Sequence, residues 1–224
     1  MKIIKSTVIG FSAIANVGIS SLAHAEIGGE LTLVSDYLAN GISQTQGDPA
    51  LQGSLEWTFD QVPGAYFGTW ASNIDAGEGD DTWLENEIYA GYTRAVNDGL
   101  KVDYGIIHYT YYGDDRSFEA DFDEIYLNLS ETSELGKTAL STYYSWNYSG
   151  TDASHIIVSL SQAFFLSTGH ELSFVIDRLV SLDHDAYQWD ENDGMTPAYT
   201  RYGAQYLASY DALSFGLSVD DTNL

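Results

Sequence analysis

The sequence predicts an all-β fold: one up-and-down antiparallel β-barrel that spans a membrane. Three observations support this prediction. Apolar and polar residues alternate along many short segments, tight turns alternate with longer links, and a secretory N-terminus precedes a chain without an apolar run long enough for a spanning helix. Because only helices and closed barrels satisfy their backbone groups in lipid, a barrel in a bacterial outer membrane fits these features best.

The segment 50–60 shows the alternation most clearly. One register holds Leu51, Leu55 and Phe59, and the other holds Gln52 and Glu56. Successive side chains on a strand point to opposite faces, so this strand has one apolar face and one polar face.

Eleven segments of this kind follow one another along the chain. They are 27–39, 50–60, 64–74, 83–95, 99–112, 121–131, 138–149, 153–166, 170–182, 198–208 and 211–220. Bacterial single-chain barrels have an even number of strands, so we expect about twelve. The sequence therefore predicts that the last strand is missing after Asp220-Asp221 and that the seam is incomplete.

The links between these segments alternate in length. Tight turns are expected at 61–64, 96–99, 133–136, 167–169 and 209–211, and longer, mostly acidic links at 40–49, 75–82, 113–120 and 183–197. The short link 148–152 breaks the trend. Short turns at one end and long loops at the other are typical of outer-membrane barrels. A secreted, soluble β-sandwich is the alternative, because its strands alternate too.

The N-terminus predicts a cleavable signal peptide over residues 1–25. Basic residues at Met1–Lys5 precede an apolar stretch at 7–22, and Ala23-His24-Ala25 has the small-x-small form of a cleavage site. An N-terminal membrane anchor is the alternative, but the stretch is short and interrupted by polar residues. The barrel domain then occupies 26–224.

The composition limits the partners. Lys and Arg number 8 against 33 Asp and Glu, for a formal net charge of −25, which argues against nucleic acid as a partner. Cysteine is absent, so a hydrogen-bonded sheet must hold the fold. The expected partners are outer-membrane lipid and lipopolysaccharide, periplasmic chaperones and the barrel-assembly machinery.

Four linked motifs occupy residues 35–75. Ser35-Asp36-Tyr37 ends a strand, Gly41-Ile42-Ser43-Gln44 forms a turn, Asp48-Pro49-Ala50-Leu51-Gln52-Gly53 starts the next strand, and Gly68-Thr69-Trp70-Ala71-Ser72-Asn73-Ile74-Asp75 ends the one after it. In these motifs the chain resembles the TorF family of porins. The resemblance implies an outer-membrane barrel with a pore function. Asn40 stands where that family often has an Arg before the Gly of the turn.

The polar registers, taken as facing inward, predict the pore lining. It consists of Glu56, Glu85, Glu87, Lys101, Asp103 and Glu124. Rings of carboxylates favour cations, so we expect passive diffusion of small hydrophilic solutes through a cation-preferring channel.

The competing function is a non-conducting barrel whose acidic loops, at 75–81, 183–185 and 190–194, bind a partner or divalent cations. Their spacing does not match an EF-hand, so no metal ligand is assigned. His108, His155, His170 and His184 lie outside any nucleophile motif, and we predict neither an enzyme nor a cofactor.

Overall fold

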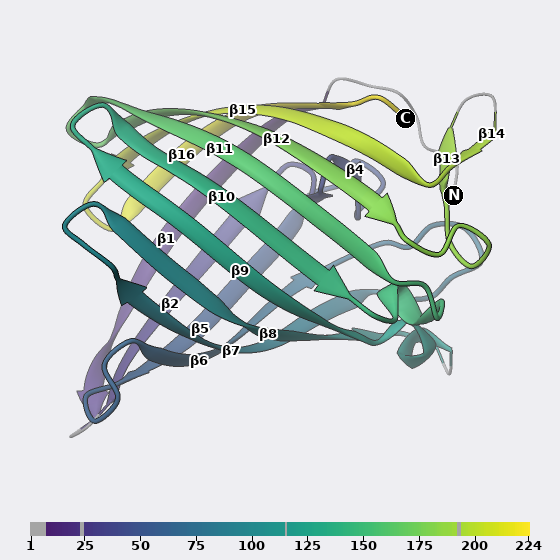
Figure 1. Ribbon diagram of the computed structural model, residues 1–224, viewed down its shortest axis with the longest axis horizontal. Coiled ribbons are helices and arrows are strands. Elements are labelled where there is room, and N and C mark those ends of the chain that lie inside the picture. The colour runs from purple at the N-terminus through teal and green to yellow at the C-terminus, as the bar shows by residue number, and fades with distance from the viewer. Residues whose placement is uncertain (1–7, 23–24, 115, 192–193) are drawn as a thin grey trace.

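The structure is a computed structural model that describes residues 8–22, 25–114, 116–191 and 194–224. Twelve long antiparallel strands close a single barrel within these residues (Figure 1). Their bounds are β1 Val8–Leu22, β2 Ala25–Val34, β5 Ala50–Phe59, β6 Ala65–Asn73, β7 Leu84–Ala95, β8 Leu100–Tyr112, β9 Phe122–Ser133, β10 Gly136–Ser145, β11 His155–Ser167, β12 His170–Ser181, β15 Ala198–Tyr210 and β16 Leu213–Thr222.

Every strand of the barrel pairs with its neighbours in the chain, and β1 closes the ring between β2 and β16. This topology confirms the predicted all-β, up-and-down antiparallel barrel. It also confirms the expected number of about twelve strands.

The predicted incomplete seam is wrong for this chain, because the barrel closes. The twelfth strand does not follow Asp220-Asp221 but comes from the N-terminus: Val8–Ala15 pairs with β16, and Ser12–Leu22 pairs with β2. An apolar stretch with small residues satisfies the same alternation as a barrel strand, so the sequence pattern concealed it. The residues of β1 are also those of the predicted signal peptide, and a chain cut after Ala25 loses this strand.

Parts of the predicted signal peptide lie outside the described residues. These are the basic region Met1–Lys5 and Ala23-His24 of the predicted cleavage site. The same holds for 192–193 in one acidic loop.

Two predicted strands are shorter in the structure. In the segment 27–39, the barrel strand ends at Val34. A separate hairpin follows, formed by β3 Leu38–Ala39 and β4 Ile42–Ser43. The segment 138–149 ends at Ser145, because η2 Tyr148–Gly150 is a 3-10 turn. Alternation continues past both strand ends, so the ends are invisible in the pattern.

The outer wall of the barrel carries large apolar side chains that lie exposed. Examples on six strands are Leu31, Leu51, Ile88, Ile106, Phe174 and Leu217. The opposite register turns polar and aromatic groups into the barrel, where Glu85, Glu124 and Asp177 are buried. This arrangement, apolar outside and polar inside, is that of a barrel built for lipid.

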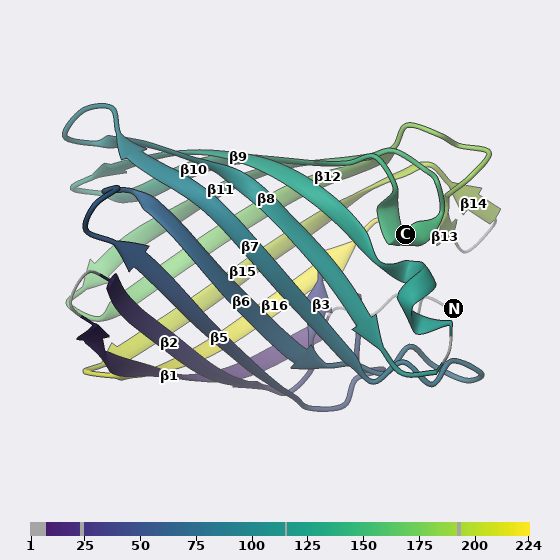
Figure 2. The same cartoon turned by 90° about the horizontal axis from the view of Figure 1, so that it is seen from below.

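The two ends of the barrel differ. Tight turns join the strands at one end, and longer connections lie at the other, which we call the loop end (Figure 2). The loop end carries the β3–β4 hairpin, η1 Ser117–Ala120, η2 and a second hairpin of β13 Trp189–Glu191 and β14 Gly194–Thr196. Among the described residues, no helix is long and apolar enough to cross a membrane.

Candidate functional site

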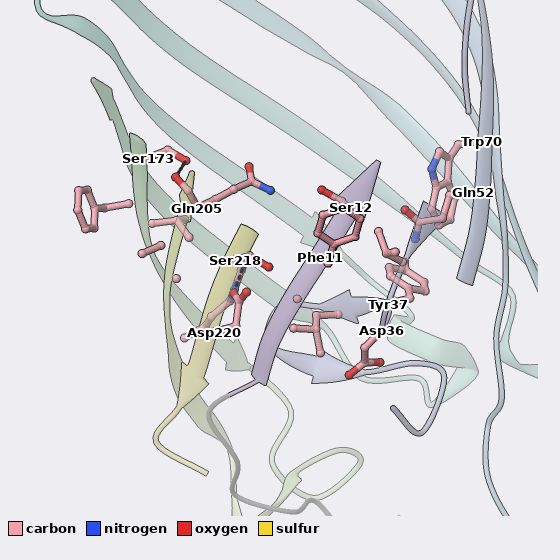
Figure 3. Close-up of a pocket in the computed structure, with 18 residues that line it drawn as sticks. Phe11, Ser12, Asp36, Tyr37, Gln52, Trp70, Ser173, Gln205, Ser218 and Asp220 are labelled. Carbon is pink, nitrogen blue, oxygen red and sulfur yellow. Dashed lines mark hydrogen bonds and ion pairs between the residues drawn. The ribbon is translucent and has the colours of Figure 1, made fainter. Parts of the chain in front are cut away.

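Three cavities of the barrel interior are lined by residues that the structure describes. The turn-side chamber, of about 750 Å³, lies between Glu56, Tyr66, Asp103 and Tyr126. The loop-side chamber, of about 600 Å³, includes Glu85, Glu124, Tyr148 and Trp189 in its wall. The seam cavity, of about 310 Å³, adjoins β1, β15 and β16 (Figure 3).

The cavities share lining residues. Glu87 lines both the turn-side and the loop-side chamber. Tyr37, Leu38 and Arg201 line both the loop-side chamber and the seam cavity. The three spaces are therefore neighbours inside one barrel, with Glu87 at the junction along its length.

All six residues predicted to line a pore lie on these walls. Glu85 and Glu124 line the loop-side chamber, and Glu87 lines both chambers. Glu56, Lys101 and Asp103 line the turn-side chamber. That a solute passes them stays a prediction.

The carboxylates of the loop-side chamber differ in their hydrogen bonds. Tyr111 Oη donates to Glu85 Oε1 at 3.0 Å, and Tyr109 Oη donates to Glu124 Oε1 at 3.1 Å. The backbone carbonyl of Glu87 accepts from Thr69 Oγ1 at 2.9 Å, but its carboxylate accepts no hydrogen bond from any residue that the structure describes. Two carboxylates are thus held by tyrosines, and the third remains available to a mobile ion.

Tyrosines fill much of the interior. Ten of the 17 tyrosines line the two chambers: Tyr37, Tyr66, Tyr89, Tyr109, Tyr111, Tyr126, Tyr143, Tyr148, Tyr187 and Tyr199. The amphipathic side chain of tyrosine suits a membrane interface as well as a polar lumen. The inward register gives most of these ten tyrosines a lumen role.

A cluster centred on Asp103 narrows the turn-side chamber. Tyr66 Oη donates to Asp103 Oδ1 at 2.7 Å and also contacts the hydroxyl of Tyr126, while Asn128 Nδ2 donates to Asp103 Oδ2 at 3.3 Å. Both tyrosine hydroxyls lie over Gly91, where an added Cβ would clash with Tyr66 Oη and with Tyr126 Oη. The missing side chain at Gly91 makes room for this cluster.

Aromatic rings form one wall of the loop-side chamber. Tyr109 stacks on Phe122 with ring centroids 4.3 Å apart, and Phe122 packs edge-on against Tyr148 at 5.2 Å. The series continues through Tyr187 and Trp189 at the base of the β13–β14 hairpin. Residues from two barrel strands and two loops therefore make one continuous aromatic surface.

Arg201 lies at the boundary of the loop-side chamber and the seam cavity. Its Nη1 donates to Asp177 Oδ2 at 2.8 Å, and its Nε donates to Asp220 Oδ1 at 2.7 Å. Both carboxylates are buried, with 2% and 5% of their surface exposed. This guanidinium is thus neutralised by two carboxylates and adds little positive field to the lumen.

The residues that carry the family resemblance hold the segment 35–49 in the loop-side mouth. Ser43 Oγ and Thr45 Oγ1 donate to Asp36 Oδ1 at 2.6 and 2.9 Å. Tyr37 packs edge-on against Trp70 at 5.5 Å, and burial raises the pKa of Tyr37, so its hydroxyl stays protonated. The β3–β4 hairpin is therefore a fixed part of the mouth.

The other motif residues attach this segment to the barrel wall. Asn73 Oδ1 accepts from Leu51 N at 2.7 Å, and Asn73 Nδ2 donates to Pro49 O at 3.3 Å. Gln52 donates to Ser72 Oγ at 3.4 Å. The remaining motif residues are turn or strand positions along the same segment: Ser35, Gly41, Gln44, Asp48 and Gly53.

Gly41 fits where a side chain would not. Its φ is +82°, and an added Cβ would come within 2.7 Å of the Thr222 side chain. Next to it, the carbonyl of Asn40 accepts a hydrogen bond from Tyr199 Oη at 3.1 Å. A backbone carbonyl, and not an arginine side chain, ties the hairpin to the β15 wall here.

Four of the five histidines, those outside the predicted signal peptide, lie apart from one another. His108 faces outward and pairs with Asp123 at 2.9 Å, and His170 contacts Tyr206 on the outer wall. His155 is buried between Tyr148 and Trp189, and His184 lies in a loop. No group of three or more His, Asp or Glu side chains suited to hold a metal was found among the described residues.

Sequence reasoning missed several residues of the lumen. Arg201, Asp220 and Trp189 were not assigned to it, and Lys137 of the turn-side chamber was overlooked. The inward register predicts Arg201, Lys137 and Asp220 once strand ends are known. Trp189 sits in a loop hairpin, where alternation gives no signal.

The fold defines the class of protein: the chain forms a closed, antiparallel twelve-stranded β-barrel. More particularly, the chain belongs to the family described as "Bacterial protein of unknown function (Gcw_chp)", which matches residues 20–215. This match leaves residues 8–19 of β1 outside. The family description does not mention TorF, so the resemblance to the TorF family stays a prediction. A comparison with curated proteins found no match.

Solved structures resemble the barrel at low sequence identity. A ΔS2 mutant of the TodX monoaromatic hydrocarbon channel is 8% identical with a TM-score of 0.50, over 96% of this chain and 88% of that chain. OccAB4 of Acinetobacter baumannii is 11% identical with a TM-score of 0.46, over 92% of this chain and 64% of its own length. OmpT of Vibrio cholerae is 8% identical with a TM-score of 0.40, over 99% of this chain and 100% of its own length. The TodX likeness shows the fold alone.

Proposed function

We propose that this protein is an outer-membrane channel for passive diffusion of small hydrophilic solutes and that it prefers cations. The observation that carries the proposal is the junction at Glu87, where a carboxylate without a hydrogen-bond donor among the described residues borders both chambers. A solute that crosses the barrel must pass this charge. Cations gain from it, and anions are repelled.

The charge around the junction supports the cation preference. Glu85 and Glu124 lie beside Glu87 in the loop-side chamber, and Arg201, the one basic side chain among the described residues of its lining, is paired with Asp177 and Asp220. The turn-side chamber is more balanced, because Lys101 and Lys137 accompany its acids. Selection is therefore expected at the loop-side half.

Planar-bilayer recording of the refolded protein tests this function. We expect discrete current steps and, in a KCl gradient, a reversal potential of the sign for K⁺ permeation. Glu87→Gln should lower the K⁺ to Cl⁻ permeability ratio by about two- to threefold, because one lumen charge is removed. Glu134→Gln, in the exposed tight turn between β9 and β10, is the matched control. Silence at high protein load would contradict the channel.

A second candidate function has one observation in its favour. The segment 35–49 and the aromatic wall occupy the loop-side mouth, which suits a non-conducting barrel that presents acidic loops to a partner or to divalent cations. This candidate predicts no current together with a thermal shift on addition of Ca²⁺. The bilayer experiment separates the two.

The outer wall of the barrel supports a location in the outer membrane. Exposed Leu, Ile and Phe side chains around the barrel suit lipid, and the fold resembles outer-membrane channels. We propose export by a signal peptide cut after Ala25, delivery by periplasmic chaperones, insertion by the barrel-assembly machinery, and contact with lipopolysaccharide at the loop end.

A further inference from the structure

We propose that the loop-side chamber is a binding site for organic ammonium ions, such as alkylamines and quaternary ammonium compounds. The inference names a solute class for the channel proposed above and rests on that function only for passage, because binding can be measured without any current. Its starting point is a cavity that combines carboxylates with aromatic faces.

The size of the chamber suits a small molecule. Its volume of about 600 Å³ lies within the range of roughly 300–1,000 Å³ that ligand pockets occupy. The chamber lies at the loop end, where η2 and the β13–β14 hairpin surround the mouth (Figure 2). Solutes from outside the cell would meet it first.

The aromatic wall gives the site its preference for organic groups. Trp189 packs against Tyr187 at 5.2 Å and against Tyr199 at 5.1 Å, both edge-on, and Tyr148 packs on Tyr187 at 5.2 Å. Trp189 and Tyr199 are buried, with 3% and 1% of their surface exposed, whereas Tyr148 and Tyr187 are half-buried and leave part of their rings open to the chamber. An ammonium ion with alkyl groups gains cation–π attraction and apolar contact from such faces.

The carboxylates give the site its preference for positively charged ligands. Glu85 and Glu124 are anchored by Tyr111 and Tyr109, so their positions are set before a ligand arrives. Glu87 completes the group without a donor from the described residues. Among the described residues that line the chamber, an anion finds no unpaired basic group, because Arg201 is held by Asp177 and Asp220.

The same geometry disfavours a bare metal ion. Ca²⁺ requires six to eight oxygen ligands. The described residues contain no group of three or more acidic or histidine side chains placed to hold a metal. Aromatic faces contribute no ligand oxygen, and they favour a large, weakly hydrated cation.

Calorimetric titration of the refolded, detergent-solubilised full chain tests the proposal. The probe is choline, and its neutral isostere 3,3-dimethylbutan-1-ol separates charge from shape. We expect choline to bind with saturation and at least about tenfold more tightly than the isostere, as loss of a charge-assisted contact implies. Equal affinity for the two compounds would overturn the proposal.

Variants locate the site. Glu87→Gln should weaken choline binding by about tenfold, whereas Glu56→Gln, a carboxylate of the turn-side chamber alone, should leave it unchanged. Trp189→Ala should also weaken it, because it removes the buried ring that supports Tyr187 in the chamber wall. Heat-modifiable gel mobility verifies that each variant is folded. Unchanged choline affinity in both Glu87→Gln and Trp189→Ala would place the binding elsewhere and overturn the proposal.

Bilayer recording distinguishes this proposal from the channel itself. Choline binding by a silent barrel would leave the site standing and reject the channel. Conductance without choline binding, and without block of the K⁺ current by choline, would reject the site and leave the channel.

Discussion

The guanidinium of Arg201 lies between the buried carboxylates of Asp177 and Asp220, with Nη1 2.8 Å from Asp177 Oδ2. Removal of one partner from a buried ion pair leaves charge without compensation, which typically costs about 3–5 kcal/mol. We expect Arg201→Met to lower the free energy of unfolding by about 3 kcal/mol, at the lower end because the lumen is polar. Urea unfolding in detergent, followed by tryptophan fluorescence, measures it.

Arg178→Met is the matched control for this variant. Arg178 lies next to Asp177 in the chain but faces outward, and it donates one hydrogen bond to Thr200 Oγ1 at 3.0 Å. An exposed polar contact contributes about 0–1 kcal/mol. A loss of stability in Arg178→Met as large as in Arg201→Met would show that the buried triad is not the cause.

A second prediction at the residue scale concerns Gly91. A Cβ at this position would lie within 2.5 Å of the hydroxyls of Tyr66 and Tyr126. We expect Gly91→Val to displace this cluster and to lower the free energy of unfolding by about 1–3 kcal/mol, as overpacking does. Gly28→Val, where nothing lies within 4 Å of the added Cβ, should be close to neutral. Urea unfolding of both variants decides, and equal stability would contradict the cluster's role.

The strands of the barrel follow from the sequence because a two-residue period leaves a visible record. The predicted segments 50–60, 83–95 and 170–182 correspond to β5, β7 and β12 within a residue or two at their ends. The β3–β4 hairpin and the β13–β14 hairpin left no such record, since short hairpins in loops are set by contacts with distant residues. Tyr199 Oη, for example, holds the carbonyl of Asn40 from 159 positions away.

The seam shows why one element was assigned differently. Residues 8–22 match a secretory apolar stretch and a barrel strand equally well, and each reading uses the same side chains. In the structure β1 separates β2 from β16, which run parallel to each other. Without β1 these two strands are left with unpaired edges, which lipid does not tolerate.

A disulfide across the seam tests whether residues 8–22 form the barrel strand β1 or are removed as a signal peptide. It can be applied both to the refolded full chain and to the protein exported in cells. The Cβ of Ser12 lies 3.6 Å from a Cβ built on Gly216, within the range for disulfides, and the chain has no other cysteine. We expect Ser12→Cys with Gly216→Cys to cross-link in the full chain refolded in detergent. In cells, the predicted cleavage after Ala25 removes residue 12 and the cysteine introduced there. The exported protein should therefore show no cross-link. Mass spectrometry should show that it begins at Glu26.

Each arm of this experiment has a contrary outcome. A cross-link in protein extracted from the outer membrane would show that β1 is retained and that the signal-peptide prediction is wrong. Absence of the cross-link in the refolded full chain would show that β1 does not pair with β16. Single-cysteine variants at the two positions control for cross-links between molecules.

At the scale of the whole molecule, the charge of −25 is unevenly placed. Carboxylates border the junction of the two chambers at Glu87, while the apolar outer wall carries few charges, such as Arg178 and Asp123. A barrel of twelve strands lies between small barrels filled by side chains and the wide channels of 16–18 strands. We therefore expect the permeability of the proposed channel to depend on the electrostatics of a narrow lumen more than on its width.

The ionic strength dependence of selectivity follows from this placement. Charges in the lumen act on a passing ion over distances that salt screens, with a Debye length of about 10 Å at 0.1 M and about 3 Å at 1 M. We expect the K⁺ to Cl⁻ permeability ratio, from reversal potentials at a fixed KCl ratio, to fall as the mean salt concentration rises from 0.1 to 1 M. In Glu87→Gln the fall should be smaller, because less lumen charge remains to be screened. A ratio that is independent of salt, or a variant that falls as steeply as the wild-type chain, would mean that lumen carboxylates do not set selectivity.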